Sequence, residues 1–343
     1  MSKVQTKTLL SVLPASVIDE LKLAGLNFTY GSVATPLAHG LSNQNFLIND
    51  GELDWVLRVN SSASSQLCDR QSEVRNWNIA ANQGLAPKLF YVSQDHAYYL
   101  SEYVQQAPEA QWGSLLTAKP AHPLIDESTL WPDAETLLLP FLRGISRLPV
   151  PENIMGVTKQ WQTYRDKLAL IAAKLSTLPN SELAVQWQMS HLELLALEDD
   201  INIWLDRLNA CSRSDQYSHR DLNPHNLLYK EGKLYCIDFE YACTSHPLFD
   251  IAGVLSTHAL STAQRHFLID GYLDGHPNLT PDAKTALPDA INIYWVFAAC
   301  WSLLMAADSG DIAVAAQNND TGENPHNSQE YLDCFDDFVA LIC

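Results

Sequence analysis

The sequence predicts an α+β protein with two lobes: a small β-rich lobe over residues 1–104 and a larger, mainly helical lobe over residues 105–343. A hairpin pattern centred on Asp50-Gly51 marks the first lobe, and helical periodicity dominates the second from residue 133 to residue 208. The chain has 343 residues, of which 47% are hydrophobic, so each lobe can bury a core of its own.

The N-terminal lobe is expected to begin with a helix near Ser16 that places Val17, Ile18 and Leu21 on one face. Its start superficially resembles a secretion signal, but Pro14 interrupts the apolar run. A short amphipathic helix is therefore the better interpretation.

The apolar runs on either side of Asp50-Gly51 predict two antiparallel strands. In the second strand the alternation places Trp55, Leu57 and Val59 on one face and Arg58 on the other. A helix over residues 72–82 follows, with Ser72 as its N-cap and with Gly84 and Pro87 ending it. Two more strands at residues 88–92 and 97–104 complete the lobe.

The C-terminal lobe follows residues 108–132, which are rich in turn formers and predict a linker or surface loop. Helical patterns fill most of residues 134–209 and return at 264–273, 289–307 and 330–342. The uncharged run 290–307 has 18 residues and could barely span a bilayer, but its alanines and polar residues indicate a buried core helix. Residues 308–328 are polar and Asn-rich, which predicts a mobile loop.

The composition limits the possible partners. Lys and Arg number 21 against 40 Asp and Glu, and the net charge of −19 argues against nucleic acid or an anionic membrane surface. The same charge is compatible with a cationic substrate. The seven cysteines are scattered and form no C-x-x-C pair, which indicates reduced thiols in a cytoplasmic protein.

Reactive side chains concentrate in residues 218–241, SHRDLNPHNLLYKEGKLYCIDFEY. Glu231-Gly232 separates two apolar runs, a pattern that predicts a hairpin. Asn226 precedes the first strand and Asp238 follows the second, so antiparallel pairing brings them to the open end of the hairpin, side by side if they pair directly. Amide and carboxylate oxygens suit Mg²⁺, which completes its shell with water and phosphate oxygens.

Asp221 lies on the same loop, five residues before Asn226. A carboxylate in this place can orient an attacking hydroxyl beside a metal-bound phosphate, as phosphoryl transfer requires. Two alternatives remain open. The loop can be merely polar, with Asp221 and Asn226 capping turns, or His219 and His225 can belong to a transition-metal site, although no third ligand has suitable spacing.

These residues resemble a known family. The run H-R-D-L-N-P-H-N at residues 219–226 matches the H-x-D-x-x-x-x-N catalytic loop of kinases. I-D-F-E-Y followed by F-D-I-A is similar to the choline/ethanolamine kinase branch of the aminoglycoside phosphotransferase-like superfamily, as are GLSNQNFLI, WVLRV, LAPKLF and CWSLL. The resemblance covers residues 30–105 and 215–305, and it implies a bilobal protein-kinase-like fold and a kinase that uses ATP and Mg²⁺.

The resemblance also implies roles for individual residues. Asp221 would be the catalytic base, with His219 and Asp250 bracing its loop, and Asn226 and Asp238 would hold Mg²⁺. The remaining residues would bind ATP: Arg58 at the phosphates, Glu73 as the partner of Arg58, Ser42 and Asn43 in the phosphate-covering turn, and backbone groups from Glu102 to Val104 at the adenine.

The acceptor is expected to be a small molecule. Asn223 stands where Ser/Thr protein kinases have a lysine, and only 11 residues separate Asp238 from Asp250, which leaves no room for a peptide-binding activation segment. The resemblance places Glu240 and Tyr241 near the acceptor.

Aromatic residues in the late apolar helix, Tyr294, Trp295 and Trp301, can form a cation–π pocket for the acceptor with a nearby carboxylate. Trp301-Ser302 matches the family pattern, but Ala298 stands where a second tryptophan is expected, and either tryptophan can be a core residue instead. Choline or ethanolamine is the first expectation. Thiamine, an amino sugar or an aminoglycoside are the alternatives.

Two other functional classes remain. A pseudokinase-like nucleotide-binding scaffold would be marked by loss of a base or metal residue, yet Asp221, Asn226 and Asp238 are all present. A small, atypical protein kinase is the second. The sequence leaves the oligomeric state open.

Overall fold

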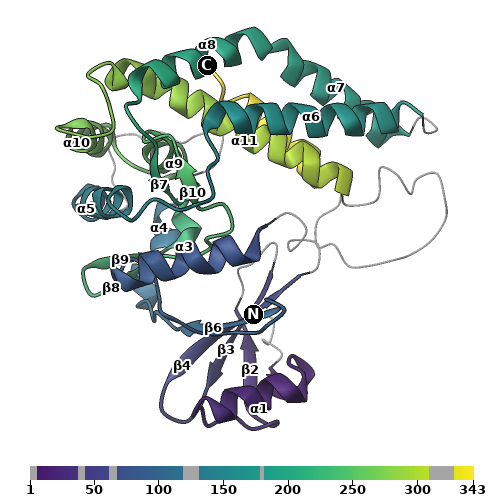
Figure 1. The fold of residues 1–343 in the computed structure, drawn as a ribbon, viewed down its shortest axis with the longest axis vertical. Coiled ribbons are helices and arrows are strands. Elements are labelled where there is room, and N and C mark those ends of the chain that lie inside the picture. The colour runs from purple at the N-terminus through teal and green to yellow at the C-terminus, as the bar shows by residue number, and fades with distance from the viewer. Residues whose placement is uncertain (1–5, 38–42, 62–67, 119–130, 178–180, 309–327) are drawn as a thin grey trace. The chain divides into compact units, whose positions relative to one another are not determined.

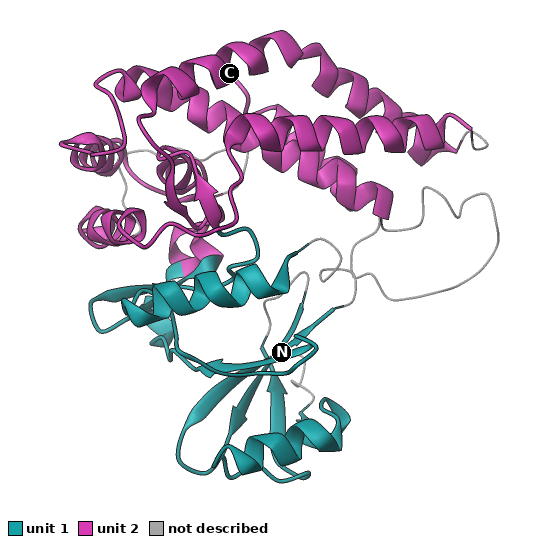
Figure 2. Ribbon diagram, viewed as in Figure 1, with its two compact units in different colours: residues 1–112, 226–242 teal, residues 113–225, 243–343 magenta. Residues whose placement is uncertain are grey.

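The structure is a computed structural model that describes residues 6–37, 43–61, 68–118, 131–177, 181–308 and 328–343. The chain divides into two compact units, unit 1 with residues 1–112 and 226–242, and unit 2 with residues 113–225 and 243–343 (Figure 2). The sequence places a single boundary at residue 104. The segment 226–242 instead groups with unit 1, where Cys236 N donates to Leu85 O at 2.8 Å and Tyr229 N donates to Gln106 Oε1 at 2.8 Å.

Unit 1 contains a six-stranded antiparallel sheet within the described residues, in the order β1-β2-β3-β4-β6-β5 (Figure 1). Its strands are β1 (Lys7–Thr8), β2 (Val33–Pro36), β3 (Asn43–Asn49), β4 (Asp54–Asn60), β5 (Leu89–Val92) and β6 (Tyr98–Glu102). Helix α1 (Ala15–Leu23) buries Val17, Ile18 and Leu21 in the same core as the inward residues of the sheet. The predicted N-terminal helix is therefore confirmed.

The β3–β4 hairpin has the predicted geometry. Asn49 pairs with Asp54 across the turn that contains Asp50-Gly51. Trp55 and Leu57 are buried in the core and Val59 packs against it, so the alternation leaves Arg58 on the opposite face of the sheet.

Helix α3 (Arg70–Asn82) begins two residues earlier than expected, and the prediction that Ser72 is its N-cap is wrong. The side chain of Asp69 caps the helix by accepting hydrogen bonds from Gln71 N at 3.1 Å and Ser72 N at 3.2 Å. Ser72 Oγ itself donates to Asp69 Oδ2 at 2.7 Å. Gly84, with a φ of +67°, follows the end of the helix, as expected for a residue that stops it.

Strands β8 (Leu227–Lys230) and β9 (Lys233–Cys236) form the predicted hairpin. Glu231 and Gly232 have φ values of +52° and +79°, as a two-residue primed turn requires. The register is Leu227 opposite Cys236, and Ile237 N donates to Asn226 O at 3.0 Å. The residue opposite Asn226 is thus Ile237, so Asn226 and Asp238 are offset by one position rather than directly paired.

Unit 2 is mainly helical, and the predicted α+β class, with a β-rich N-terminal and a helical C-terminal region, is confirmed. Its helices include α4 (Trp112–Leu116), α5 (Ala134–Ser146), α6 (Val157–Leu175), α7 (Glu182–Ala196), α8 (Glu198–Cys211), α9 (Phe249–Thr257), α10 (Thr262–Leu273), α11 (Ala283–Asp308) and α13 (Ser328–Val339). A short antiparallel pair, β7 (Gln216–Ser218) with β10 (Cys243–Ser245), flanks the reactive loop. The sequence analysis did not predict α9.

Helix α11 is the centre of unit 2 and contacts α6, α7, α8, α9 and α13 (Figure 1). By length and composition it is the one helix in the described part of the chain that could cross a membrane. However, 61% of its most apolar 18-residue window is buried inside the structure, which is the burial expected of a core helix.

Two predicted loops are only partly described. The expected linker over residues 108–132 includes a 3₁₀ turn (Pro108–Ala110) and α4, and Trp112 is fully buried, so this part is not a simple linker. Its residues 119–130, and residues 309–327 of the expected mobile loop, lie outside the described residues.

Candidate active site

The candidate site residues of unit 1 gather around Arg58 on β4. Its Nη1 lies 3.0 Å from Glu73 Oε1 on α3 and 3.4 Å from Asp238 Oδ1 after β9, and its Nη2 lies 3.9 Å from Glu240 Oε2. Arg58 Nε donates to Asn60 Oδ1 at 2.8 Å. Three segments far apart in sequence therefore converge on one guanidinium, whose Nη2 is buried without a hydrogen-bond partner among the described residues. We call Arg58, Arg70, Glu73, Asp238 and Glu240 the Arg58 cluster.

Glu73 is fully buried in this cluster and is held by more than Arg58. Its Oε2 accepts hydrogen bonds from Arg70 Nη1 at 2.7 Å and from the Tyr99 hydroxyl at 3.2 Å. The contact with Arg58 is an ion pair by distance, without the alignment of a hydrogen bond. The expected Arg58–Glu73 pair is thus present, and Arg70 adds a second cation that the sequence analysis did not identify.

The Arg58 cluster contains three carboxyl and two guanidinium groups, so it carries one excess negative charge when all three carboxyls are ionised. Burial works to lower the pKa of Arg58, but the carboxylates of Asp238, Glu73 and Glu240 raise it above its usual value. Burial and the charge of Asp238 raise the pKa of Glu240 well above that of a free carboxyl. A cation would relieve this excess.

The donor set at the open end of the β8–β9 hairpin fits Mg²⁺. Asp238, with a side chain 30% exposed, offers carboxylate oxygens, and Asn226 lies across from its neighbour Ile237. Among the described residues, no group of three or more His, Cys, Asp or Glu side chains could hold a metal ion. Mg²⁺ binds to sites with few protein ligands when phosphate oxygens and water supply the remaining ligands.

The remaining residues expected to bind ATP lie at the edges of β3 and β6. Asn43 begins β3 and is buried, and its Oδ1 accepts from Ser61 N at 3.2 Å and Arg70 Nη2 at 3.5 Å. Ser42 lies outside the described residues. Glu102 ends β6 with its N–H donated to Lys88 O at 2.9 Å, whereas the backbone of Val104 makes no hydrogen bond to another described residue.

In unit 2 the loop that carries Asp221 is anchored by Asp250 on α9. The buried Asp250 carboxylate accepts hydrogen bonds from Ser218 Oγ at 2.8 Å, His219 N at 3.1 Å and Arg220 N at 2.8 Å. Burial raises the pKa of Asp250, and these three donors oppose the rise. The bracing role expected of Asp250 has this geometric basis.

Arg220 adds a second anchor. It adopts a φ of +71°, which is uncommon for a residue with a side chain. Its guanidinium lies 4.2 Å from the ring centroid of Phe249 and donates to Ser245 Oγ at 3.0 Å and Met155 O at 3.1 Å. These contacts stabilise the turn immediately before Asp221.

Asp221 itself is partly exposed and oriented by its neighbours. Asn223 Nδ2 donates to Asp221 Oδ1 at 2.8 Å, and Asp221 N donates to Nδ1 of the fully buried His219 at 3.4 Å. His225 is exposed, and its Nε2 lies 3.1 Å from Thr117 Oγ1. It takes no part in the hydrogen bond between Asp221 N and His219 Nδ1. The loop therefore presents one carboxylate, with one oxygen fixed by an amide donor.

The residues expected to bind the acceptor come from both units. Glu240 belongs to the Arg58 cluster, and the neighbouring Tyr241 is 40% exposed. Trp295 on α11 is 4% exposed and stacks on Phe338 with ring centroids 5.6 Å apart, as a core residue would. Trp301 is partly exposed and meets Tyr331 of α13 edge to face at 5.7 Å.

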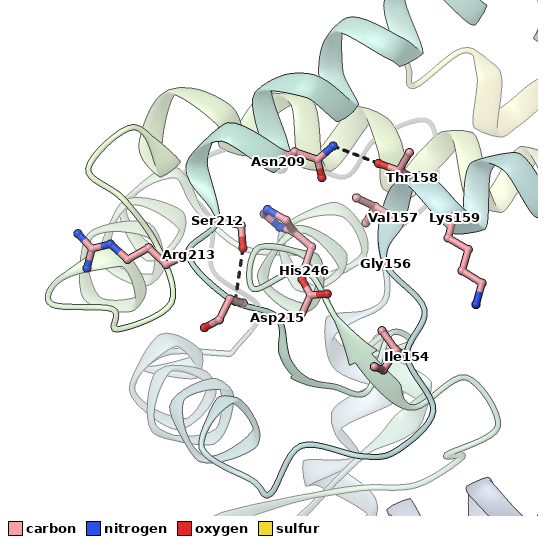
Figure 3. A pocket seen from close by; sticks show the side chains of 11 residues that line it. Ile154, Gly156, Val157, Thr158, Lys159, Asn209, Ser212, Arg213, Asp215 and His246 are labelled. Carbon is pink, nitrogen blue, oxygen red and sulfur yellow. Dashed lines mark hydrogen bonds between the residues drawn. The ribbon is translucent and has the colours of Figure 1, made fainter.

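A separate cavity of about 540 Å³ in unit 2 holds none of the predicted site residues (Figure 3). It lies at the start of α6, where Asn209 Nδ2 donates to Thr158 Oγ1 at 3.1 Å. The side chains of Lys159 and Arg213 extend away from the others drawn in Figure 3. Asp215 and His246 also line the cavity.

Sequence reasoning did not assign Asn60 or Arg70 to the site, and it treated Asn223 only as a departure from protein kinases. Asn60 is two residues after Arg58 and so lies on the same face of β4, a signal that the strand period contains. Arg70 precedes Glu73 by three residues, one helical turn. Asn223 carries no signal of its own, because the loop conformation decides where its amide points.

Comparisons with known proteins agree with this arrangement. A family model described as "Phosphotransferase enzyme family" matches residues 33–281. The chain is 24% identical over 239 residues to Protein LicA of Haemophilus influenzae and 25% identical over 203 residues to Ethanolamine kinase 2 of Mus musculus. These matches cover 68% and 58% of this chain, but only 60% and 45% of the relatives' own length.

Among solved structures, the fold is similar to that of choline kinase LicA from Streptococcus pneumoniae, with a TM-score of 0.58 and 17% identity. The superposition covers 95% of this chain and 98% of the other. At this identity the similarity establishes the fold, and it places the chain among kinase-like folds.

Proposed function

The chain belongs to the phosphotransferase enzyme family, and on that premise we propose that it transfers the γ-phosphate of ATP to the hydroxyl of a small cationic alcohol, choline or ethanolamine. The observation that carries the proposal is Arg58, a buried guanidinium whose Nη2 has no hydrogen-bond partner among the described residues and which lies 3.4 Å from Asp238. A buried N–H donor without a hydrogen bond is costly unless a ligand satisfies it, and a phosphate oxygen does so.

In this proposal unit 1 binds the nucleotide. Arg58 contacts a phosphate while Glu73 and Asn60 hold its guanidinium in place. Asn43, with Ser42 beside it, covers the phosphates, and the backbone from Glu102 to Val104 pairs with the adenine. The Val104 backbone has no competing hydrogen bond within the described chain, which suits this role.

Asn226 and Asp238 would hold Mg²⁺. Mg²⁺ bound there would supply positive charge that neutralises the phosphates during transfer to the acceptor. The protein's contribution is the arrangement of oxygen ligands next to Arg58, so that metal and guanidinium serve the same phosphates. We expect Asp238→Asn to weaken Mg²⁺-dependent nucleotide binding more than nucleotide binding without metal.

Asp221 orients the acceptor hydroxyl and accepts its proton. Asn223 Nδ2 donates to one oxygen of the carboxylate and so fixes its orientation. Asp250 acts through the loop backbone and is a positioning residue, as is His219 through the Asp221 N–H. Such fixed placement supplies much of the catalysis in phosphoryl transfer.

The relatives' names favour choline or ethanolamine, since similar proteins are named as a choline kinase and as an ethanolamine kinase. The net charge of −19 favours a cationic acceptor over an anionic one. Thiamine and amino sugars satisfy the same charge argument and stay as alternatives.

The test is phosphorylation of a metabolite panel, read by mass, with ATP and Mg²⁺ and the full chain. The panel contains choline, ethanolamine, thiamine, glucosamine and an aminoglycoside, and Asp221→Ala is the inactive control. We expect one phosphorylated cationic alcohol and none with Asp221→Ala. Nucleotide binding without any product would support a pseudokinase-like scaffold instead, and transfer to lysate proteins alone would support a protein kinase.

A further inference from the structure

One side-chain oxygen in unit 1 joins three segments of the chain. Gln106 Oε1 accepts a hydrogen bond from Tyr229 N on β8 at 2.8 Å and another from Trp112 N, at the start of α4, at 3.2 Å. Gln106 itself lies in the stretch between β6 and α4. An amide oxygen has two lone pairs, so these two bonds use its full capacity as an acceptor.

Aromatic packing fixes the same junction. The Trp112 side chain is fully buried, and its ring stacks on that of Tyr229 with the centroids 6.5 Å apart and the planes 29° apart. Trp112 N belongs to the first turn of α4, where no carbonyl of the helix can accept from it. Gln106 therefore accepts from a backbone N–H next to a buried indole, and its loss would take this acceptor from two backbone donors.

Gln106 lies between the two ends of the proposed nucleotide site. The backbone from Glu102 to Val104, proposed to pair with adenine, precedes it on the same stretch. Its partner strand β8 begins directly after Asn226, and Asp238 follows β9 at the same end of the hairpin. All of these residues belong to unit 1. One side chain thus connects the stretch at the adenine with the hairpin that would hold Mg²⁺.

The hairpin has a second attachment on its other strand. Cys236 N of β9 donates to Leu85 O, which follows α3, at 2.8 Å. That bond ties the hairpin to the segment between α3 and β5, whereas the Gln106 bond ties it to the stretch at the adenine. Without Gln106, β8 would keep the stacking between Tyr229 and Trp112 but lose a hydrogen bond, whose distance and angle are narrowly restricted. The spacing between the two ends would then be less well defined.

We propose that Gln106 is a positioning residue for nucleotide binding, which fixes the adenine-binding backbone relative to the hairpin end that carries Asn226 and Asp238. The inference rests on the proposed function, from which it takes both ends of the nucleotide site. Gln106 touches neither ATP nor metal and acts through the backbone N–H of Tyr229. A nucleotide held at both ends gains from the fixed spacing, because binding at one end places the other. A nucleotide that reaches only the adenine end does not gain from it.

Isothermal titration of the full chain with Mg²⁺·ATP and with AMP tests this role. AMP has the adenine but lacks the β- and γ-phosphates that a metal at Asn226 and Asp238 would neutralise. Gln106→Met keeps the length of the side chain and removes the acceptor oxygen. We expect it to weaken Mg²⁺·ATP binding about tenfold, because part of the strength of two hydrogen bonds is lost, and to weaken AMP binding by less than about twofold.

Further variants provide a rescue, an alternative and a control. Gln106→Glu supplies a carboxylate oxygen to the same two donors and should restore Mg²⁺·ATP binding to within about threefold of the parent protein. Gln106→Asn keeps the amide on a side chain one methylene shorter. It should show the same difference between the two nucleotides, and it decides the question if Gln106→Met does not fold. Gln83→Met changes an exposed glutamine at the end of α3 and should leave both affinities unchanged.

In turnover, the same role predicts that Gln106→Met raises KM for ATP and leaves KM for the acceptor unchanged, whichever member of the panel is phosphorylated. The inference is overturned if folded Gln106→Met binds Mg²⁺·ATP as the parent protein does, or if both affinities fall by the same factor, which would show a disturbed adenine end. It is also overturned if Gln106→Glu is impaired as much as Gln106→Met. A parent protein that binds no nucleotide refutes the proposed function itself, which is a different result.

Discussion

The side-chain oxygen of Asn60 accepts a hydrogen bond from Arg58 Nε at 2.8 Å, and its amide donates to His96 O at 2.7 Å. Asn60 therefore connects the central guanidinium of the Arg58 cluster to the loop before β6. Since Arg58 Nη1 is engaged by carboxylates, this bond from Nε fixes the plane of the guanidinium and the direction of Nη2.

Asn60→Ala is expected to weaken ATP binding by about tenfold, because a hydrogen bond to a charged group contributes roughly 1.5–3 kcal/mol and part of that loss falls on ligand binding. Isothermal titration with ATP measures it. Asn49→Ala, an exposed asparagine on the same sheet, is the matched control and should bind ATP as the parent protein does. Equal affinities in both variants would show that Asn60 does not position Arg58.

Glu73→Gln is expected to lower the free energy of unfolding by about 3 kcal/mol or more, because it leaves Arg58 and Arg70 buried with less compensation. Asp270→Asn removes one partner of an exposed pair with Lys284, whose side chains are 66% and 68% exposed, and should lower the free energy of unfolding far less, because solvent screens an exposed pair. Urea denaturation of both variants compares the two. If the two variants lose a similar free energy of unfolding, burial does not make the Glu73 ion pairs more important for stability than the exposed Asp270–Lys284 pair.

Asp250→Asn is expected to reduce kcat far more than Ser218→Ala does. The asparagine has one acceptor oxygen for the donors from Ser218, His219 and Arg220, so the loop before Asp221 loses part of its anchor. Ser218→Ala removes one of the three bonds and should cost about 1 kcal/mol of stability with little change in kcat. A positioning role predicts that KM for ATP is unaffected in either variant, and a large change in that KM would argue against it.

Buried histidines, His258 and His276 among them, should lower stability as the pH falls from about 6.5 toward 4, because they stay neutral in the folded protein. Burial lowers the pKa of His258 to about 3 and that of His276 to about 4, from an ordinary value of 6.5. Below pH 6.5 the unfolded chain binds protons that the folded chain does not, so unfolding is favoured increasingly until the folded-state pKa is passed.

Thermal melting at pH 7.5, 6.5, 5.5 and 4.5 checks this direction. His258→Gln removes one of the two groups and should flatten the loss between pH 6.5 and 4.5, even if its stability at pH 7.5 is lower. Glu240, whose pKa burial and the charge of Asp238 raise to about 8, changes stability in the opposite direction over this range, but it does so equally in both proteins. If the melting temperature falls equally with pH in the parent protein and in His258→Gln, His258 is not a buried neutral histidine that contributes to the loss.

The sequence alone determined the features that local interactions control. The Glu231-Gly232 turn, the α1 and α3 helices and the inward face of β4 follow from turn chemistry and side-chain periodicity, and the structure has them. The class of the fold and the family followed as well, because the H-x-D-x-x-x-x-N pattern lies within one short segment.

Tertiary structure decided the features that depend on contacts between distant segments or on a strand register that shifts by one residue. Arg58 has partners from β4, α3 and the segment after β9, and no local pattern specifies that Arg70 and Tyr99 share Glu73. In the β8–β9 hairpin, the register pairs Asn226 with Ile237, one residue from the expected partner. On α11, successive residues point about 100° apart, so packing against Phe338 buries Trp295 while Tyr294 is partly exposed and packs near Phe249 of α9. Composition names the aromatic residues of a helix, but burial selects which of them can meet a ligand.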